Sequence, residues 1–430
     1  MATTSPTDTP ASAQRLGATF HRFWAAGTLT NLGDGMLATA LPLIAATLTH
    51  DPLAVSGLMV ARFLPWLLVA PFAGVLLDRV DRFRAMAVAN LVAATAVGLL
   101  AVAILTGHAS LWLLYATLFT VICCETVTDP ASRLGVVRLV PPGLLDRANG
   151  RLEGGRLVAQ DFVAAPVAGV LFAVAAVLPV AGVALSYALC AVLVATIVVI
   201  LRRTPQKEAT PDGGGQALAR GVWTSLREGF GHVFGDPLLR RLMLNNAGIM
   251  IGGQMGAAVL VLYVQHTLGV PPALFGLFLA SSAVGGLLGS LWTSRLIGLL
   301  GRRAVMMGGY VGMGVCFVLV GVLPNAYVAA LAWGVSGLCM VVSNIAASLF
   351  FQTVIPDHLR GRASGAFRAI GWGTAPLGAL AGGLLGRIDL ALPFVVGGLV
   401  AVGTALVLRR TVAECARLCD EAVADPGHDA

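Results

Sequence analysis

Four ionisable residues lie inside long apolar stretches of the sequence: Asp34, Arg62, Glu125 and Asp129. A charged side chain in the interior of a bilayer costs at least about 2.5–3.5 kcal/mol, so each of these residues needs a structural or functional reason. A carboxyl group that is partly shielded from water can bind and release a proton near neutral pH. The three carboxylates are therefore candidates for proton coupling or substrate binding. Arg62 is a candidate for pairing either with Asp34 or with an anionic group of a substrate.

The spacing and depth of the acids suggest two different roles. Glu125, Asp129 and Arg133 recur every four residues, which places them on one face of a helix. For Asp129, a structural pair with Arg133 near the membrane surface is the favoured interpretation. Glu125 lies deeper in its apolar run. Asp34 lies near the middle of its run between two glycines, which let a neighbouring backbone or a substrate approach. These two positions favour a functional role.

Membrane-spanning helices are the elements that can position these residues. Of the 430 residues, 57% are apolar and 11% are charged, whereas a soluble domain carries about 25% charged residues. This composition excludes a soluble enzyme, a nucleic-acid-binding protein and a disordered scaffold. A spanning helix needs roughly 20 apolar residues. We predict an all-α integral membrane protein with twelve transmembrane helices, at about 20–48, 53–77, 84–106, 110–133, 156–178, 181–201, 241–267, 272–298, 303–323, 327–353, 363–386 and 390–409.

The distribution of basic residues predicts the orientation of the chain. Lys and Arg concentrate in the cytoplasmic loops of membrane proteins. If both termini are cytoplasmic, 26 of the 28 Lys and Arg residues fall on the cytoplasmic side, Arg387 falls outside and Arg62 lies within a span. We therefore predict a multi-pass protein of the cell membrane with both termini cytoplasmic.

A polar linker at 202–240 divides the chain into two halves. Its polar part, from Arg202 to about Asp236, contains Pro205, Pro211 and a run of three glycines, followed by apolar residues at helical spacing. We therefore predict a cytoplasmic linker with an amphipathic helix on the membrane surface. The linker separates an N-terminal six-helix bundle (20–201) from a C-terminal six-helix bundle (241–409). A cytoplasmic lead (1–19) and a cytoplasmic tail (410–430) flank the two bundles.

The two halves have the character of repeats. Two short motifs recur at an offset of 211 or 210 residues: Gly150-Arg151-x-x-Gly154 with Gly361-Arg362-x-x-Gly365, and Ala165-Pro166 with Ala375-Pro376. A shared offset at two independent points indicates duplication. The halves differ in charge, because the only acids between residues 240 and 410 are Asp357 and Asp389, both in predicted loops. Any carboxylate that carries a proton is therefore expected in the first half.

The loop between the second and third predicted spans resembles the G-x-x-x-D-R-x-x-R-[KR] loop of the major facilitator superfamily. Its residues here are Gly74, Asp78, Arg79, Arg82 and Arg84. The resemblance implies two six-helix bundles around a central cavity. A glycine in such a loop lets two helices approach closely, and an aspartate can bind a helix N-terminus or an arginine in one conformation only. We therefore expect this loop to be a conformational latch, with a positive topology signal as the alternative.

Other segments resemble the twelve-span drug/proton antiporter branch, which includes macrolide and siderophore exporters. They are Asn31-Leu-Gly-Asp34, Ala61-Arg62-Phe-Leu-Pro65, Leu139-Val-Pro141 with Ala148-Asn149, and Leu359-Arg360-Gly361-Arg362. The chain departs from the superfamily where Glu125 replaces the arginine motif of the fourth span. It departs again where the Gly-Pro-rich fifth span is reduced to Ala165-Pro166-x-x-Gly169. The first departure weakens a borrowed proton-relay scheme, and the second weakens, without removing, the assignment to export.

The resemblance also implies which polar residues face the cavity, since spans 1, 4, 7 and 10 line it in this superfamily. The candidates are Asn31, Asn245, Asn246, Gln254 and Asn344. Neutral groups opposite first-half acids suit an amphipathic substrate. The alternative is that these residues make ordinary hydrogen bonds between helices.

These observations predict a secondary active transporter that exports small amphipathic compounds, such as drugs, antibiotics or siderophores, by alternating access. We expect the proton gradient as the energy source, no cofactor, no metal site and no enzymatic activity. The expected partners are the lipid bilayer and a small-molecule substrate, with no nucleic acid, and the expected state is a monomer. One alternative is an uptake permease for a sugar, metabolite or siderophore. Another is a non-transporting membrane receptor or assembly partner.

Overall fold

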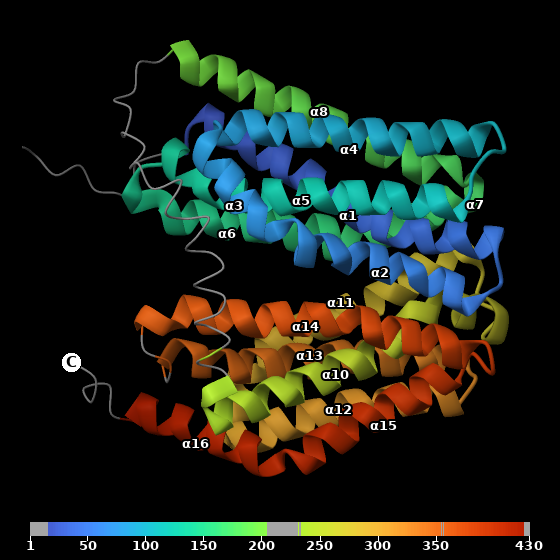
Figure 1. The fold of residues 1–430 in the computed structure, drawn as a ribbon, viewed down its shortest axis with the longest axis vertical. Coiled ribbons are helices and arrows are strands. Elements are labelled where there is room, and N and C mark those ends of the chain that lie inside the picture. Colours follow the sequence, from blue (N-terminus) through green and yellow to red (C-terminus); the bar gives the residue numbers. More distant parts are fainter. Residues whose placement is uncertain (1–15, 204–230, 232–233, 354, 356, 425–430) are drawn as a thin grey trace, which may run out of the picture.

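The computed structural model describes residues 16–203, 231, 234–353, 355 and 357–424, and the regular elements of this part of the chain are helices (Figure 1). The all-helical prediction is therefore confirmed. The first half contains α1 (Ala18–Leu48), α2 (Pro52–Leu68), α3 (Ala70–Arg79), α4 (Arg82–Leu105), α5 (Leu111–Leu139), α6 (Leu145–Arg156), the π-helix η3 (Leu157–Val163), α7 (Ala164–Val174) and α8 (Val177–Arg203). The second half contains α10 (Pro237–Leu262), the π-helix η4 (Tyr263–Thr267), α11 (Pro272–Leu300), α12 (Arg302–Val322), α13 (Ala326–Thr353), α14 (Asp357–Gly386), α15 (Leu392–Val407) and α16 (Arg409–Ala424).

Membrane-length helices dominate both halves. Among the described residues, 9 helices are long and apolar enough to cross a bilayer. The pair α15 and α16, which is bent by 62°, would add a tenth if it counted as one span. Helix α2 is apolar but shorter, because the helix is interrupted at Val69 and continues as α3. The linker predicted at 202–240, with its amphipathic helix, falls largely outside the described residues.

Local sequence signals explain where several helices begin. Asp51 accepts a hydrogen bond from the backbone N–H of Leu53, and Pro52 occupies the first turn of α2. Asp236 caps α10 in the same way. A side-chain acceptor before the first turn satisfies backbone donors that have no partner within the helix, and a proline in that turn has no donor to lose.

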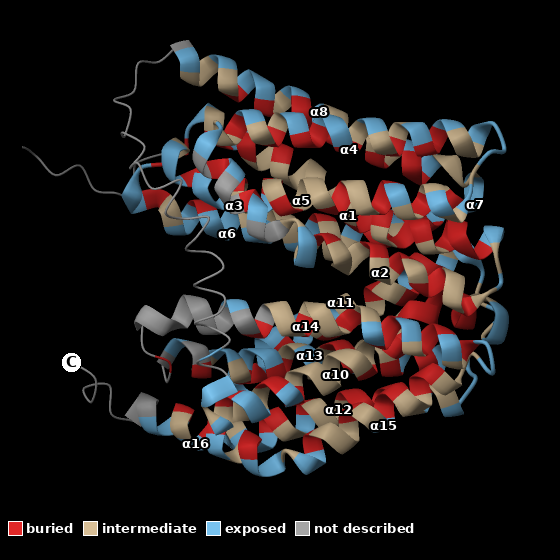
Figure 2. Ribbon diagram, viewed as in Figure 1, coloured by how far each residue is buried: buried red, intermediate tan, exposed pale blue. Residues whose placement is uncertain are grey.

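The apolar core shows how the two halves meet. One cluster of buried residues includes side chains from both halves, such as Leu41 and Leu43 of α1, Val259 of α10 and Phe278 of α11. At the other end of the molecule the core separates into one cluster in the first half and one in the second. Figure 2 shows the buried residues concentrated on the right, where the two bundles come together. We call this the closed end, and its loops include 49–51, 106–110, 268–271, 323–325 and 387–391.

Two symmetric helix pairs join the halves. Helix α2 packs against α14, and α7 packs against α11. In terms of the predicted spans, the second span of each half therefore contacts the fifth span of the other half. This arrangement fits the repeat detected in the sequence. Glycines make both contacts close: a Cβ added at Gly383 would lie 2.8 Å from Cα of Leu53, and one at Gly169 would lie 3.0 Å from the carbonyl oxygen of Ala273. Side chains larger than hydrogen at these positions would push the bundles apart.

An ion pair bridges the halves at the rim of the closed end. The Nε and Nη2 groups of Arg387 donate to the two carboxylate oxygens of Asp51 at 2.7 and 2.6 Å. Arg387, the basic residue that the topology analysis placed outside, therefore has its partner 336 residues away in the chain. The hydrogen bonds from Arg387 lower the pKa of Asp51 below its ordinary value.

Loss of this ion pair is expected to weaken the closed end modestly, because the Arg387 side chain is exposed and that of Asp51 is partly exposed. Asp51→Asn should shift the equilibrium between closed and open forms by less than about fivefold. Since the pKa of Asp51 is lowered, the ion pair stabilises the closed end at any pH above about 4, and the effect disappears as the pH falls through that lowered value. Pulsed electron spin resonance distances between labels at His108→Cys and Tyr327→Cys, in a background without the native cysteines, measure the shift at pH 7 and its loss as the pH falls below about 4.

The double variant Asp51→Asn with Arg387→Gln serves as the control for this prediction, because asparagine can still cap α2. It should shift the distances no further than either single variant, since each of them already removes the ion pair. Equal distributions for wild type and both single variants would contradict a role for the pair.

The predicted tail contains a docked helix. Helix α16 buries Val412, Cys415 and Cys419 against the second half. Arg302 binds Asp420 of this helix at 2.9 Å and also donates to the carbonyl oxygen of Ala346 at 3.1 Å. The tail is thus anchored to the end of the second half that lies opposite the closed end.

Candidate functional site

A buried carboxylate–tyrosine pair forms the centre of the candidate site. Asp34 lies on α1, and its Oδ1 accepts a hydrogen bond of 2.6 Å from the hydroxyl of Tyr187 on α8. Tyr187 is 1% exposed. Gly33 makes this approach possible, because a Cβ there would lie 3.2 Å from the tyrosine ring. The glycine next to the acid therefore has a packing reason.

The polar contacts continue one turn along α1. The hydroxyl of Thr30 lies 3.0 Å from Sγ of Cys190 on α8 and 3.3 Å from Oδ1 of Asn90 on α4. Asn90 is buried and donates in turn to the carbonyl oxygen of Met86 at 2.8 Å. Buried polar groups are costly unless they are hydrogen-bonded. This set of contacts therefore fixes the register of α1 against α8 and α4.

A π-helical segment packs behind the carboxylate. A Cβ at Gly35 would lie 2.5 Å from the carbonyl oxygen of Gln160 in η3 and 2.6 Å from Cβ of Ala164. Single π-turns inside α-helices occur frequently at functional sites, because they disturb the regular backbone hydrogen bonds. Here the π-turn meets α1 directly beside Asp34.

The structure brings the four ionisable candidates together. Glu125 of α5, Asp129 of α5 and Arg62 of α2 lie close enough to Asp34 for their charges to act on it. Arg62 also acts on Glu125. The hydrogen bond to Asp34 nevertheless comes from Tyr187, a residue that the sequence analysis did not select. The sequence offered only a weak signal for Tyr187. A buried tyrosine in an apolar run needs a hydrogen-bond partner for its hydroxyl, but the sequence does not show which partner.

A polar cavity adjoins this cluster. It has a volume of about 460 Å³ and lies within the first half, among α1, α5 and α6. Asn31, Asp129 and Arg133 line it together with Arg156. Asn31 donates to the carbonyl oxygen of Gly27 at 2.8 Å. Arg156 binds Glu153 at 2.7 Å. The cavity thus presents both signs of charge and amide groups to a ligand.

The second-half candidates lie in different environments. Asn245 is buried, and its Oδ1 has no hydrogen-bond partner within the described part of the chain. Asn246 lies beside Gly371, where a Cβ would be 2.9 Å from Nδ2. Gln254 is half-buried and Asn344 is exposed. The four residues therefore differ in their exposure and in their neighbours.

In the predicted latch loop, the side chain with a defined role is Asp81. It accepts from the backbone N–H of Arg84 at 3.0 Å and lies 3.6 Å from Arg138 of α5. Gly74 and Asp78 belong to α3, and the surroundings of these two positions lie outside what the structure describes. Arg79 and Arg84 are exposed, and Arg82, the first residue of α4, is half-buried.

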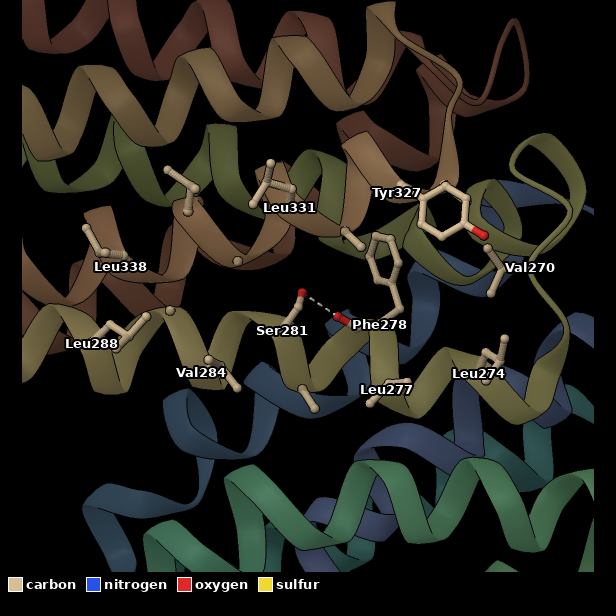
Figure 3. Close-up of a pocket in the computed structure, with 16 residues that line it drawn as sticks. Val270, Leu274, Leu277, Phe278, Ser281, Val284, Leu288, Tyr327, Leu331 and Leu338 are labelled. Carbon is tan, nitrogen blue, oxygen red and sulfur yellow. Dashed lines mark hydrogen bonds between the residues drawn. The ribbon is translucent and has the colours of Figure 1, made fainter.

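A large groove on the second half has different chemistry. It has a volume of about 610 Å³, lies between α11 and α13, and is lined mainly by apolar residues (Figure 3). Ser281 contributes a hydroxyl, but this group donates to the carbonyl oxygen of Phe278 within its own helix. Leu277 and Leu331 on its walls are strongly exposed. The groove has the character of a surface that contacts lipid, and its lining residues include no carboxylate, ammonium, guanidinium or imidazole group.

Comparison with known proteins places this arrangement in a family. Residues 11–424 match the family model described as a transmembrane secretion effector. The chain belongs to this family of the major facilitator superfamily. It is 24% identical to the multidrug efflux pump Tap of Mycolicibacterium fortuitum, with 86% of this chain and 91% of that protein covered. It is 23% identical to macrolide efflux protein A of Streptococcus pyogenes, with 90% and 94% covered.

Solved structures support the same fold. A bacterial homologue of the iron transporter ferroportin in an inward-facing state superimposes with a TM-score of 0.72 at 17% identity, and the match covers 94% of this chain and 100% of that one. The resemblance to the major facilitator superfamily and to its drug-exporter-like branch is therefore confirmed. As a transporter of this kind, the protein resides in the cell membrane, contacts the lipid bilayer and acts on a small-molecule substrate.

Proposed function

We propose that this transmembrane secretion effector exports small amphipathic compounds, with macrolides as the first class to examine, in exchange for protons. The observation that carries the proposal is the Asp34–Tyr187 hydrogen bond, which fixes a carboxylate inside the first half near Glu125 and Arg62. A carboxylate held in this way can bind a proton in one conformation and release it in another. The names of the relatives support the direction and the substrate class.

We further propose twelve spans with both termini in the cytoplasm. Helices α2 and α3 would then count as one span, as would α6, η3 and α7, which follow one another without a loop. The bias of basic residues supports this orientation. In this orientation the closed end lies on the outer side of the membrane, and the polar cavity of the first half faces the cytoplasm.

The transport cycle follows from this orientation. A substrate would enter from the cytoplasm next to Asn31 and Asp129. The halves would then rock about the mid-membrane site, with closed-end contacts breaking on the outer side. A proton taken up from outside by Asp34 or Glu125 would then displace the substrate. The protein would return to its inward-facing form and release this proton to the cytoplasm. We propose that a monomer without a cofactor performs this cycle.

Accumulation of radiolabelled erythromycin in cells that express the protein tests this proposal. We expect steady-state accumulation below that of cells without the protein, and a protonophore should raise it to the same level. Increased accumulation on expression would instead support an uptake permease, and no change across erythromycin, ethidium and a siderophore would support a non-transporting role. Either outcome would overturn the export proposal.

A further inference from the structure

Two histidines from different halves meet at the rim of the closed end. His50 follows α1, and His266 lies in η4 after α10. Their ring centroids are 4.9 Å apart, with the ring planes at 84° to each other. Both side chains are exposed. The transport mechanism proposed above does not use either residue.

The backbone on both sides of this contact is fixed. His50 precedes Asp51, whose carboxylate binds Arg387 and the backbone N–H of Leu53. On the other side, η4 starts at Tyr263, which is fully buried and donates to the carbonyl oxygen of Val320 at 2.5 Å. The two imidazoles therefore approach each other from anchored backbone positions, and both rings are exposed.

Two neighbouring imidazoles have the chemistry of a transition-metal site. Neutral imidazole nitrogen is a preferred ligand of Zn²⁺, Cu²⁺ and Ni²⁺. Two nitrogens bound to one tetrahedral zinc ion lie about 3.3 Å apart, given metal–nitrogen distances of 2.0–2.1 Å. Rings whose centroids are 4.9 Å apart can bring two nitrogens to that separation by rotation of the side chains. Within the described residues no group of three or more His, Cys, Asp or Glu side chains surrounds a point, so water would complete the coordination.

We propose that His50 and His266 bind a divalent transition-metal ion at the outer surface and thereby lock the closed end. The ion would link the two halves in the conformation in which the histidines meet. A ligand that binds one conformation better than another shifts the population toward it. The bound metal therefore holds the transporter in its inward-facing form and inhibits turnover. This inference goes beyond the export function, because metal binding requires only the geometry of the closed end.

Zinc titration of the purified full-length protein, prepared without a polyhistidine tag, tests the site. By calorimetry, wild type should bind one Zn²⁺ per chain at the outer site, and either His50→Gln or His266→Gln should weaken that binding at least about tenfold. His108→Gln is the matched control, since His108 also lies in a loop at the closed end but outside this pair. It should bind Zn²⁺ like wild type. Unchanged zinc binding in both His50→Gln and His266→Gln would overturn the proposal.

The conformational effect needs a separate measurement. The distance is measured between spin labels at Trp112→Cys and Tyr327→Cys, in a background without the native cysteines. Zn²⁺ should narrow the distance distribution toward shorter values in wild type and leave it unchanged in His266→Gln. An equal effect of Zn²⁺ on the label distances of wild type and His266→Gln, or a longer distance in wild type, would contradict the proposed lock. Neither readout depends on transport, so a failure here is distinguishable from a failure of the export proposal.

Discussion

Asp34→Asn is expected to abolish uphill export while leaving the protein folded and able to bind substrate. Asparagine keeps the shape of the side chain and can still accept the hydrogen bond from Tyr187, but it cannot bind and release a proton. Coupling to the pH gradient should therefore disappear. We expect accumulation of erythromycin in inside-out vesicles with an acidic lumen to fall at least about tenfold, because an intramembrane carboxylate in this position is the default coupling group.

A second measurement separates lost coupling from lost structure. Exchange of labelled for unlabelled erythromycin across the vesicle membrane needs no net proton movement, so Asp34→Asn should retain it. Tyr187→Phe is the matched variant, because it keeps the carboxylate and removes its hydrogen-bond donor. It should slow transport and retain coupling. Loss of exchange together with loss of uphill transport in Asp34→Asn would contradict a specific coupling role.

Gly276→Leu is expected to prevent the closed end from closing. Gly276 of α11 faces the backbone of Ala165 and Pro166 in α7, with no room for a side chain between the two halves. Overpacking costs about 1–3 kcal/mol, which corresponds to a shift of about 5- to 150-fold in the equilibrium between closed and open forms. The shift should favour the outward-facing form, since each half keeps its own packing.

Distances between spin labels on the outer loops measure this effect, together with the rate of export. Gly276→Leu should lengthen these distances. It should also reduce the rate of export by a factor similar to its shift of the equilibrium between closed and open forms. Gly308→Leu in α12 is the matched control, because that exposed position has nothing within 4 Å of an added Cβ. Equal distances for Gly276→Leu and wild type would show that α7 and α11 do not form the outer contact.

The sequence alone could predict those residues of the candidate site whose ionisable side chains are energetically costly to place in a bilayer. Asp34, Arg62 and Glu125 stand out in any apolar run, and the charges of all three act on one another in the structure. Most of the predicted spans appear as helices for the same reason, since a long apolar run in a bilayer has few other ways to satisfy its backbone.

Features that depend on contacts distant in sequence could not be predicted. Tyr187 lies 153 residues from Asp34 and has the appearance of an ordinary core residue. Arg387 was recognised as an outer charge, but its partner Asp51 follows only from the packing of α2 against α14. The π-turn η3 leaves no periodic signal in a run that is apolar on most sides. The docking of α16 similarly depends on Arg302 at the start of α12, which lies 118 residues from its partner Asp420.

Substrate-induced proton movement is the most direct test of the central claim that carboxylates of the first half couple export to protons. Inside-out vesicles containing the protein and a pH-sensitive dye are loaded with an acidic lumen, and erythromycin is added outside. The wild type should alkalinise the lumen, and the double variant Asp34→Asn with Glu125→Gln should not. Equal alkalinisation by the two proteins would contradict the account.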